Sequence, residues 1–191
     1  SKIKLLFMIE DKKFNNLDFQ EQSLEDEYYN CNFINCNFSE MHIHDVVFED
    51  CSFELCNFSL AKMDSCWRDV KFKECKMTGA NFTKINNFSS FGFERCNLQY
   101  ASFMKTKLKC TKFIDCNLQE VDFSEANLSM SVFKNCDMTR AFFSNTNIEK
   151  ADFTTAYNYI IDPNRNIIRK ARFSKDGLSG LLLPFGIIIV D

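Results

Sequence analysis

Ten cysteines and two histidines are the residues of this 191-residue chain whose chemistry could hold a metal or attack a substrate. Zinc sites favour cysteines separated by roughly two to four residues and joined by histidines. Four residues lie between Cys31 and Cys36, with no histidine among them, while His42 and His44 flank the apolar Ile43. We expect both histidines to face solvent, with no cysteine facing the same way. The sequence therefore predicts no metal site and no cofactor.

Other catalytic patterns are missing from the sequence. It contains neither a glycine-rich phosphate-binding loop nor a nucleophile elbow. Neighbouring carboxylates such as Glu49 and Asp50 could act as acid and base. Such chemistry needs a pocket that excludes water, and the repeats described next predict a convex surface instead. We therefore predict that the protein is not an enzyme.

A five-residue repeat positions all of these side chains. Large apolar residues recur every five positions from Phe33 to Met63, from Trp67 to Phe82 and from Phe88 to Phe153. An α-helix has a period of about 3.6 residues and a strand a period of about 2, so neither explains the pattern. Two residues before most large residues lies a small one, and the residue between them is usually polar, as in Cys36-Asn37-Phe38.

Triplets such as Ala126-Asn127-Leu128, each followed by two variable residues, resemble those of the pentapeptide repeat proteins. The resemblance covers about residues 14 to 153. It implies an all-β, right-handed quadrilateral β-helix in which each repeat forms one side of a square coil. About seven to eight coils are expected. We divide the chain into an N-terminal cap at 1–13, the β-helix at 14–153, and a C-terminal cap and dimerisation segment at 154–191.

A spacing of about twenty residues supports the four-sided arrangement. Phenylalanines and cysteines both recur at this interval, and each set should stack as one buried column, the cysteines as small packing residues. The phenylalanine column is Phe33, Phe53, Phe72, Phe93, Phe113, Phe133 and Phe153, and the cysteine column is Cys36, Cys56, Cys75, Cys96, Cys116 and Cys136. Cys66 and Cys110 lie outside the small inward position, so we expect them to be more accessible.

Three irregularities are expected to distort individual coils. Phe14, Phe19, Leu24 and Tyr29 continue the repeat toward the N-terminus, one residue out of phase. One residue of the repeat is missing between Met63 and Trp67, and one extra residue between Phe82 and Phe88 restores the twenty-residue spacing. Phe91 then takes a position where a small residue is expected, so its coil should be locally distorted.

The C-terminal tail is strongly apolar but too short to span a bilayer. An open solenoid end exposes core and unpaired strand edges and must be covered. We expect the tail to cap the rod and to form a symmetric dimer interface, as in the quinolone-resistance type of pentapeptide repeat protein that it resembles, with a cap alone as the alternative. The predicted interface residues are Leu178, Leu181, Leu182, Leu183, Phe185, Ile187 and Ile189.

Charge is distributed in bands along the chain. Residues 21–69 hold eleven acidic and two basic side chains, residues 70–112 nine basic and two acidic, and residues 113–153 seven acidic and three basic. In the four-sided arrangement, acids of the first band cluster on two neighbouring faces. We predict a site for a basic partner there, with ordinary solvation as the alternative. Its residues are Asp45, Glu49, Asp50, Asp64 and Asp69.

Resemblance to the quinolone-resistance type implies a DNA mimic that binds a type II topoisomerase, DNA gyrase or topoisomerase IV, and modulates its inhibition. The alternative is an interaction scaffold for an unrelated protein. Direct nucleic-acid binding through the belt from Lys105 to Lys112 is not expected, because the surrounding acids oppose it. We expect a cytoplasmic protein, without membrane association, that forms a homodimer.

Overall fold

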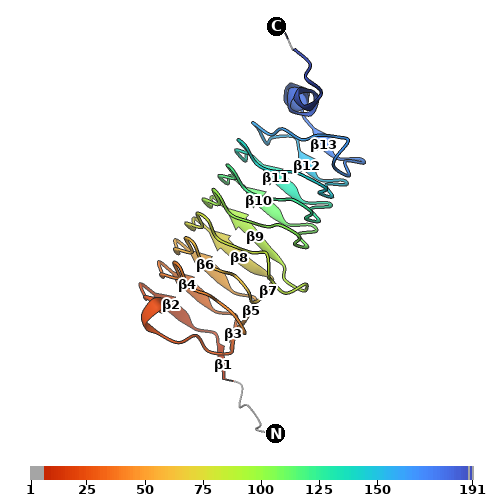
Figure 1. Ribbon diagram of the computed structural model, residues 1–191. Coiled ribbons are helices and arrows are strands. Elements are labelled where there is room, and N and C mark those ends of the chain that lie inside the picture. The colour runs from red at the N-terminus through yellow and green to blue at the C-terminus, as the bar shows by residue number, and fades with distance from the viewer. Residues whose placement is uncertain (1–6, 189, 191) are drawn as a thin grey trace.

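The protein forms a straight β-helical rod (Figure 1), and the computed structural model describes residues 7–188 and residue 190. Two sides of the rod contain regular parallel sheets. Sheet A consists of β1 (Met8–Glu10), β3 (Glu27–Tyr29), β5 (Val47–Glu49) and β7 (Cys66–Arg68). Sheet B consists of β2 (Lys13–Asn15), β4 (Asn32–Ile34), β6 (Ser52–Glu54), β8 (Val70–Lys73), β9 (Phe91–Glu94), β10 (Lys112–Ile114), β11 (Val132–Lys134), β12 (Asp152–Phe153) and β13 (Arg172–Phe173).

The two remaining sides are held by single parallel bridges between successive coils. One series begins with Asp18 and Asn37 and ends at Tyr157, while the other runs from His42 to Phe142. Beyond β7, bridges from Lys107 to Ile167 form the side that sheet A occupies in the N-terminal coils. The predicted four-sided, all-β solenoid of about eight coils is therefore confirmed.

Most corners of the coils are made by residues in the left-handed conformation, two positions after a large inward residue. Glu40 has φ 61°, Leu60 φ 60° and Gly79 φ 69° at successive turns of one corner. The polar residue before each large one supports this geometry. Oδ1 of Asn37, for example, accepts the backbone N–H of Ser39 at 3.1 Å. This local hydrogen bond explains why asparagine and aspartate recur at that position.

The phenylalanine column forms a continuous stack through the rod. It begins at Phe14, one coil before Phe33, and continues past Phe153 to Phe173, with successive ring centroids 4.5 to 5.3 Å apart. Parallel pairing of sheet B sets this spacing, because each phenylalanine pairs in register with the next, as Phe93 does with Phe113. Ring stacking thus adds to the burial of apolar surface.

All ten cysteines are free thiols, and the six of the cysteine column are buried. Burial raises the pKa of the Cys51 thiol in a neighbouring column to about 12, which keeps it protonated. Cys110 is exposed, as predicted, but Cys66 is buried, so the prediction of an accessible Cys66 is wrong. Cys66 lies in β7, in register with Val47 of β5. The backbone carbonyls of its neighbours Ser65 and Trp67 accept hydrogen bonds from the N–H groups of Asn86 and Ser90, which holds the 86–90 loop beside it.

Phe88 does not occupy the inward position that the period of five assigns to it, because 79% of its surface is exposed. Asn86 closes a tight turn here, with Oδ1 accepting the N–H of Phe88 at 2.9 Å. The inserted residue is therefore looped out, and Phe91 enters the core instead, with its ring centroid 5.8 Å from that of Phe82. The looped-out residue and the entry of Phe91 into the core explain the predicted distortion of this coil.

The first coil also differs from expectation. Tyr28 is buried and stacks on Phe48 at 5.1 Å, whereas Tyr29 faces outward. The phase shift therefore lies between Leu24 and Tyr28, four residues apart, instead of after Tyr29. β1 pairs with β3, so residues 8–10 add a strand to the N-terminal end of sheet A.

The stacked coils also continue past the predicted boundary at residue 153, because β12 pairs with β13. Beyond β13 come η2 (Asp176–Leu178), α1 (Ser179–Leu182) and η3 (Leu183–Phe185), which lie at the opposite end of the rod from β1 (Figure 1). The N–H of Ile161 donates to the carbonyl of Gly180 at 2.9 Å and ties α1 to the last coil. Within the described part of the chain, no helix has the length and apolar character needed to cross a membrane.

Candidate binding surfaces

Two of the predicted acidic residues lie side by side on one corner of the rod. β5 and β7 pair with Glu49 opposite Arg68, so the residues that follow them, Asp50 and Asp69, occupy successive levels. Both are exposed and adopt the left-handed corner conformation, with φ 53° and 51°. Parallel strands are about 4.8 Å apart, so these carboxylates form a row along the rod axis.

Asp11 belongs to the same row, and the sequence analysis missed it. Its φ of 55° marks it as a corner residue below Asn30 and Asp50. Asn30 Nδ2 donates to Asp11 Oδ1 at 2.6 Å and so bridges the two levels. Spacings of 19 and 20 residues between these positions were the signal that could have revealed it. We refer to Asp11, Asp50 and Asp69 as the acidic row.

Glu49 contributes less negative charge than predicted. Arg68 lies directly above it on sheet A, and Nη1 of Arg68 is 2.6 Å from Oε2 of Glu49. Both side chains remain well exposed, so the pair itself stabilises the fold little. Its consequence is electrostatic, because it neutralises the middle of the predicted acidic face next to the acidic row.

Asp45 and Asp64 each contact a histidine on the adjoining side of the rod. His42 Nε2 lies 2.7 Å from Asp64 Oδ2, and His44 Nδ1 lies 3.0 Å from Asp45 Oδ2. The Asp64 side chain is largely covered, whereas that of Asp45 is 86% exposed. The rest of the described chain, like this cluster, holds no group of three or more side chains able to bind a metal ion.

The structure therefore separates the five predicted acids into different environments. Asp50 and Asp69 form an open row, while β5 lies between that row and Asp45 at the next corner. Glu49 is paired with arginine and Asp64 is covered beside His42. A basic partner approaching the N-terminal half of the rod would meet the acidic row on one corner and Asp45 on the other.

The C-terminal segment has both a capping part and an exposed apolar part. Leu181 packs against the buried core, whereas Leu178, Leu182, Leu183, Phe185 and Ile187 are each at least 40% exposed. Ile189 lies outside the described residues. Ile160 and Ile167, in the coil beneath, are also exposed. The sequence analysis did not include them, although their apolar character at outward positions was a usable signal.

Several large apolar side chains exposed at one end of the rod are typical of an interaction site. Tyr159 anchors it from below, since its buried ring lies between the last phenylalanine rings and α1. Its ring centroid is 5.8 Å from that of Phe153 and 5.6 Å from that of Phe173. The apolar surface is therefore presented on a well-packed base.

A family model described as a pentapeptide repeat region matches residues 27–103 and 86–157 of the chain, which together are more than half of its length. No curated protein sequence matches it significantly. Similar solved structures include full-length QnrB1, described as a plasmid-mediated fluoroquinolone resistance protein. It is 19% identical, covers 95% of this chain and 100% of its own, and has a TM-score of 0.46. HetL, a pentapeptide repeat protein of heterocyst differentiation regulation from the cyanobacterium Nostoc, is 14% identical, covers 96% and 93%, and has a TM-score of 0.42.

Proposed function

The chain belongs to the pentapeptide repeat family, and we propose that it is a non-enzymatic, DNA-mimicking protein that binds a type II topoisomerase. In this proposal it changes the inhibition of DNA gyrase by quinolones or similar toxins. The observation that carries the proposal is the acidic row, which follows the axis of a rod without an ion-pairing cation on Asp50 or Asp69 among the described residues.

Dimensions of the rod support the proposal. The nine strands of sheet B give eight spacings of about 4.8 Å, or a length of roughly 38 Å. DNA presents about one negative charge for every 1.7 Å of its axis, and proteins that bind it use extended basic surfaces. A row of carboxylates on a narrow rod can be attracted to such a surface by charge complementarity.

We propose a type II topoisomerase as the partner because the repeats and the apolar tail resemble those of the quinolone-resistance type. That resemblance also favours a homodimer joined through the C-terminal apolar surface, which would double the rod. Burying exposed side chains such as Leu183 and Phe185 against a second copy removes apolar surface from water. Ten free thiols are consistent with a reducing cytoplasm, where we place the protein.

A supercoiling assay with purified gyrase, with and without a quinolone, tests the proposal. We expect micromolar protein to inhibit supercoiling or to restore it in the presence of the drug. The Asp50→Asn/Asp69→Asn double variant should lose this effect, because two of the three carboxylates of the acidic row are neutralised. The Asp122→Asn/Glu125→Gln variant makes the same charge change elsewhere on the rod and should keep it. If the unaltered protein neither inhibits nor rescues gyrase, the proposal is wrong.

An interaction scaffold for a different protein is the second candidate. The observation that favours it is the basic belt formed by Lys105, Lys107, Lys109 and Lys112, which interrupts the negative charge along the rod. DNA has no such interruption. Repeated recovery of one partner other than a topoisomerase by affinity purification, confirmed with the purified proteins, would favour the scaffold.

A further inference from the structure

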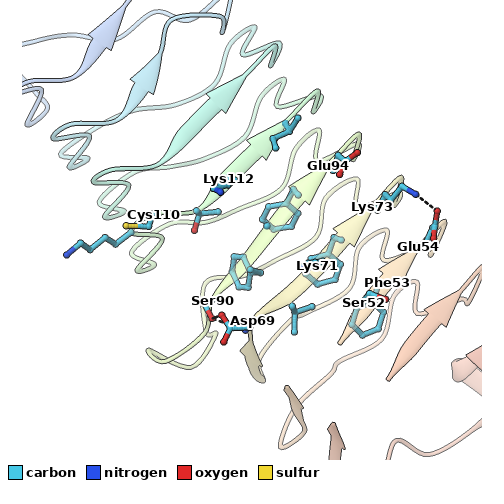
Figure 2. A pocket seen from close by; sticks show the side chains of 18 residues that line it. Ser52, Phe53, Glu54, Asp69, Lys71, Lys73, Ser90, Glu94, Cys110 and Lys112 are labelled. Atoms are coloured by element: carbon cyan, nitrogen blue, oxygen red, sulfur yellow. Dashed lines mark hydrogen bonds and ion pairs between the residues drawn. The ribbon is translucent and has the colours of Figure 1, made fainter. Parts of the chain in front are cut away.

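A groove of about 590 Å³ opens on the outer face of sheet B, within the basic segment of the chain (Figure 2). Its floor is an axial row of outward positions on four neighbouring strands. Strand register places Gly92 of β9 directly between Lys71 of β8 and Lys112 of β10. Cys110 and Lys109 line the same groove on the side toward sheet A.

Nothing in the backbone requires a glycine at position 92. A Cβ atom there would meet only the carbonyl oxygen of Lys112, at 3.7 Å, which is an ordinary contact. The φ angle of Gly92 is not in the left-handed region, unlike that of Gly79. Glycine weakens a strand interior because it loses more conformational entropy and has no side chain to pack. The effect of Gly92 on this surface is to leave the floor of the groove open.

The net charge of the groove's side chains without an ion pair is positive, because three lysines outnumber one carboxylate, Asp69, among the described residues. Lys73 is 2.6 Å from Glu54, and Arg95 is paired with Glu74 and Glu94. Among the residues that the structure describes, Lys71, Lys109 and Lys112 are exposed and make no ion pair. The nearby carboxylate of Asp69 accepts a hydrogen bond from Ser90 Oγ at 3.1 Å. An occupant of the groove is therefore expected to be anionic.

The spacing of the lysines suits an extended peptide. Lys71 and Lys112 lie two strand spacings apart, or about 9.6 Å, with the open floor between them. In an extended segment, alternate residues face the same way and are about 6.7 Å apart. Acidic residues at positions i and i+4, with an apolar residue at i+2 on the same face, therefore place their carboxylates about 13 Å apart. Each lysine would need to lean outward by about 2 Å, which its flexible side chain allows.

We propose that this groove binds an extended acidic segment of a partner protein, with an apolar side chain over Gly92 and a carboxylate on each side contacting Lys71 and Lys112. Openness of the groove favours a polymer over a small molecule, which usually needs a site that encloses most of its surface. A nucleic acid is the other anionic polymer to consider, and competition with an oligonucleotide distinguishes it from the acidic segment. The groove adjoins the acidic row at Asp69, but the proposed contacts are made by Lys71 and Lys112, which lie outside that row, so its test is independent of the topoisomerase proposal.

The probe is a fluorescein-labelled, amidated peptide of sequence Glu-Ala-Leu-Ala-Glu, with binding followed by fluorescence anisotropy at low salt. We expect saturable binding to the unaltered protein. Lys71→Gln/Lys112→Gln should weaken it about tenfold, since each exposed charge pair contributes a factor of roughly 2 to 5. Lys134→Gln removes a lysine of the same sheet outside the groove and should change the affinity less than about twofold.

A second pair of variants tests the open floor. Gly92→Leu fills the space and should abolish binding, while Val132→Leu, two strands further along the same row, should have no effect. Thermal unfolding of both variants shows whether the fold is retained. Because the lysine variants do not alter the backbone, the proposal stays testable even if Gly92→Leu fails to fold.

Alkylation of Cys110 locates the peptide. It is the exposed cysteine in the lining, so bound peptide should slow its reaction with a maleimide. Three results would overturn the proposal: no saturable binding, equal binding of a Lys-Ala-Leu-Ala-Lys peptide, or equal binding to the lysine and control variants. Displacement of the acidic peptide by a single-stranded oligonucleotide at comparable concentration would assign the groove to nucleic acid instead.

Discussion

The ring of Phe93 lies flat on the ring of Phe113, with 5.1 Å between their centroids and 10° between their planes. The two side chains come from paired strands, β9 and β10, and are inaccessible to solvent. Each is also stacked on the next phenylalanine of the column, so the rings repeat through the core at the spacing of the strands. The stack is continuous from Phe14 to Phe173 because the register of sheet B is kept from one coil to the next.

Replacing Phe113 with alanine should destabilise the protein by about 3–5 kcal/mol, because it removes a buried ring and leaves a cavity between two others. Phe88→Ala is the matched control. The same period of five assigns it to the core, but it is exposed, so its replacement should cost less than about 0.5 kcal/mol. Denaturant unfolding of both variants measures the difference. Equal losses would contradict the looped-out position of Phe88.

Two glycines should respond in opposite ways to alanine. Gly79 has φ 69°, and a Cβ there would lie 2.7 Å from Leu60 Cδ2, so Gly79→Ala should destabilise by about 1 kcal/mol. Gly92→Ala has room in a strand and should be neutral or stabilise by about 0.5 kcal/mol. Thermal midpoints of the two variants provide the comparison. A loss of stability in Gly92→Ala would mean that the backbone needs this glycine.

One cysteine should react rapidly with a thiol reagent in the native protein. Cys110 is exposed, whereas the other nine are buried and the pKa of Cys51 is raised to about 12 by burial. A titration with a chromogenic disulfide should therefore report one fast thiol in buffer and ten in denaturant, and Cys110→Ser should remove the fast phase. Rapid reaction of Cys66 as well would show that its loop opens readily.

Gly180→Ala should detach the C-terminal cap. A Cβ at this position would lie 2.1 Å from the carbonyl oxygen of Tyr159, a backbone atom that cannot move aside. We expect a loss of about 1–3 kcal/mol, as for overpacked cores. Leu183→Ser, at an exposed position, should leave the unfolding of the monomer unchanged but weaken the proposed dimer. Light scattering after gel filtration, beside denaturant unfolding, separates capping from dimerisation.

Asp137 should make the protein sensitive to acid. Burial alone would raise the pKa of this carboxyl, but hydrogen bonds from Thr139, Gln119 and Asn158 outweigh it and leave the pKa lowered. A group with a lowered pKa in the folded state stabilises the fold above its ordinary pKa of about 3.9, and this contribution is lost as the pH falls through the lower value. Stability should therefore decrease on acidification below about pH 4.

Asp137→Asn should weaken that dependence, since an amide does not titrate in this range. Asparagine fits the position, because Asn117 one coil away accepts the N–H of Gln119 with its own Oδ1 at 3.0 Å. Thermal midpoints measured across acid pH for both proteins test the point. An unchanged slope in the variant would mean that other carboxyls cause the acid sensitivity.

Much of the fold could be predicted from the sequence because each repeat is a local unit. Five residues suffice to define a small inward residue, a large inward residue and a left-handed corner, and the twenty-residue interval aligns them into columns. Phe33 to Phe153 and Cys36 to Cys136 could therefore be assigned to buried columns without coordinates. The resemblance to a known family follows from the same triplets, and the family match agrees with it.

The exceptions depended on contacts between coils. Whether Phe88 or Phe91 enters the core depends on where the chain can close a turn while keeping sheet B in register, and no five-residue window contains that choice. Tyr28 was preferred over Tyr29 for the same reason, because it has to stack on Phe48. Cys66 was buried by its neighbours, although its place in the repeat predicted access.

The sequence by itself determined the repeat, the inward residues and the overall charge bands, because these depend only on the spacing of residues along the chain. Only the tertiary structure decided which charges remain available. Stacking placed Arg68 over Glu49, left Asp50 and Asp69 open, and set Gly92 between Lys71 and Lys112. Surface chemistry on a solenoid depends on residues about twenty apart being about 4.8 Å apart, and the fold alone creates that proximity.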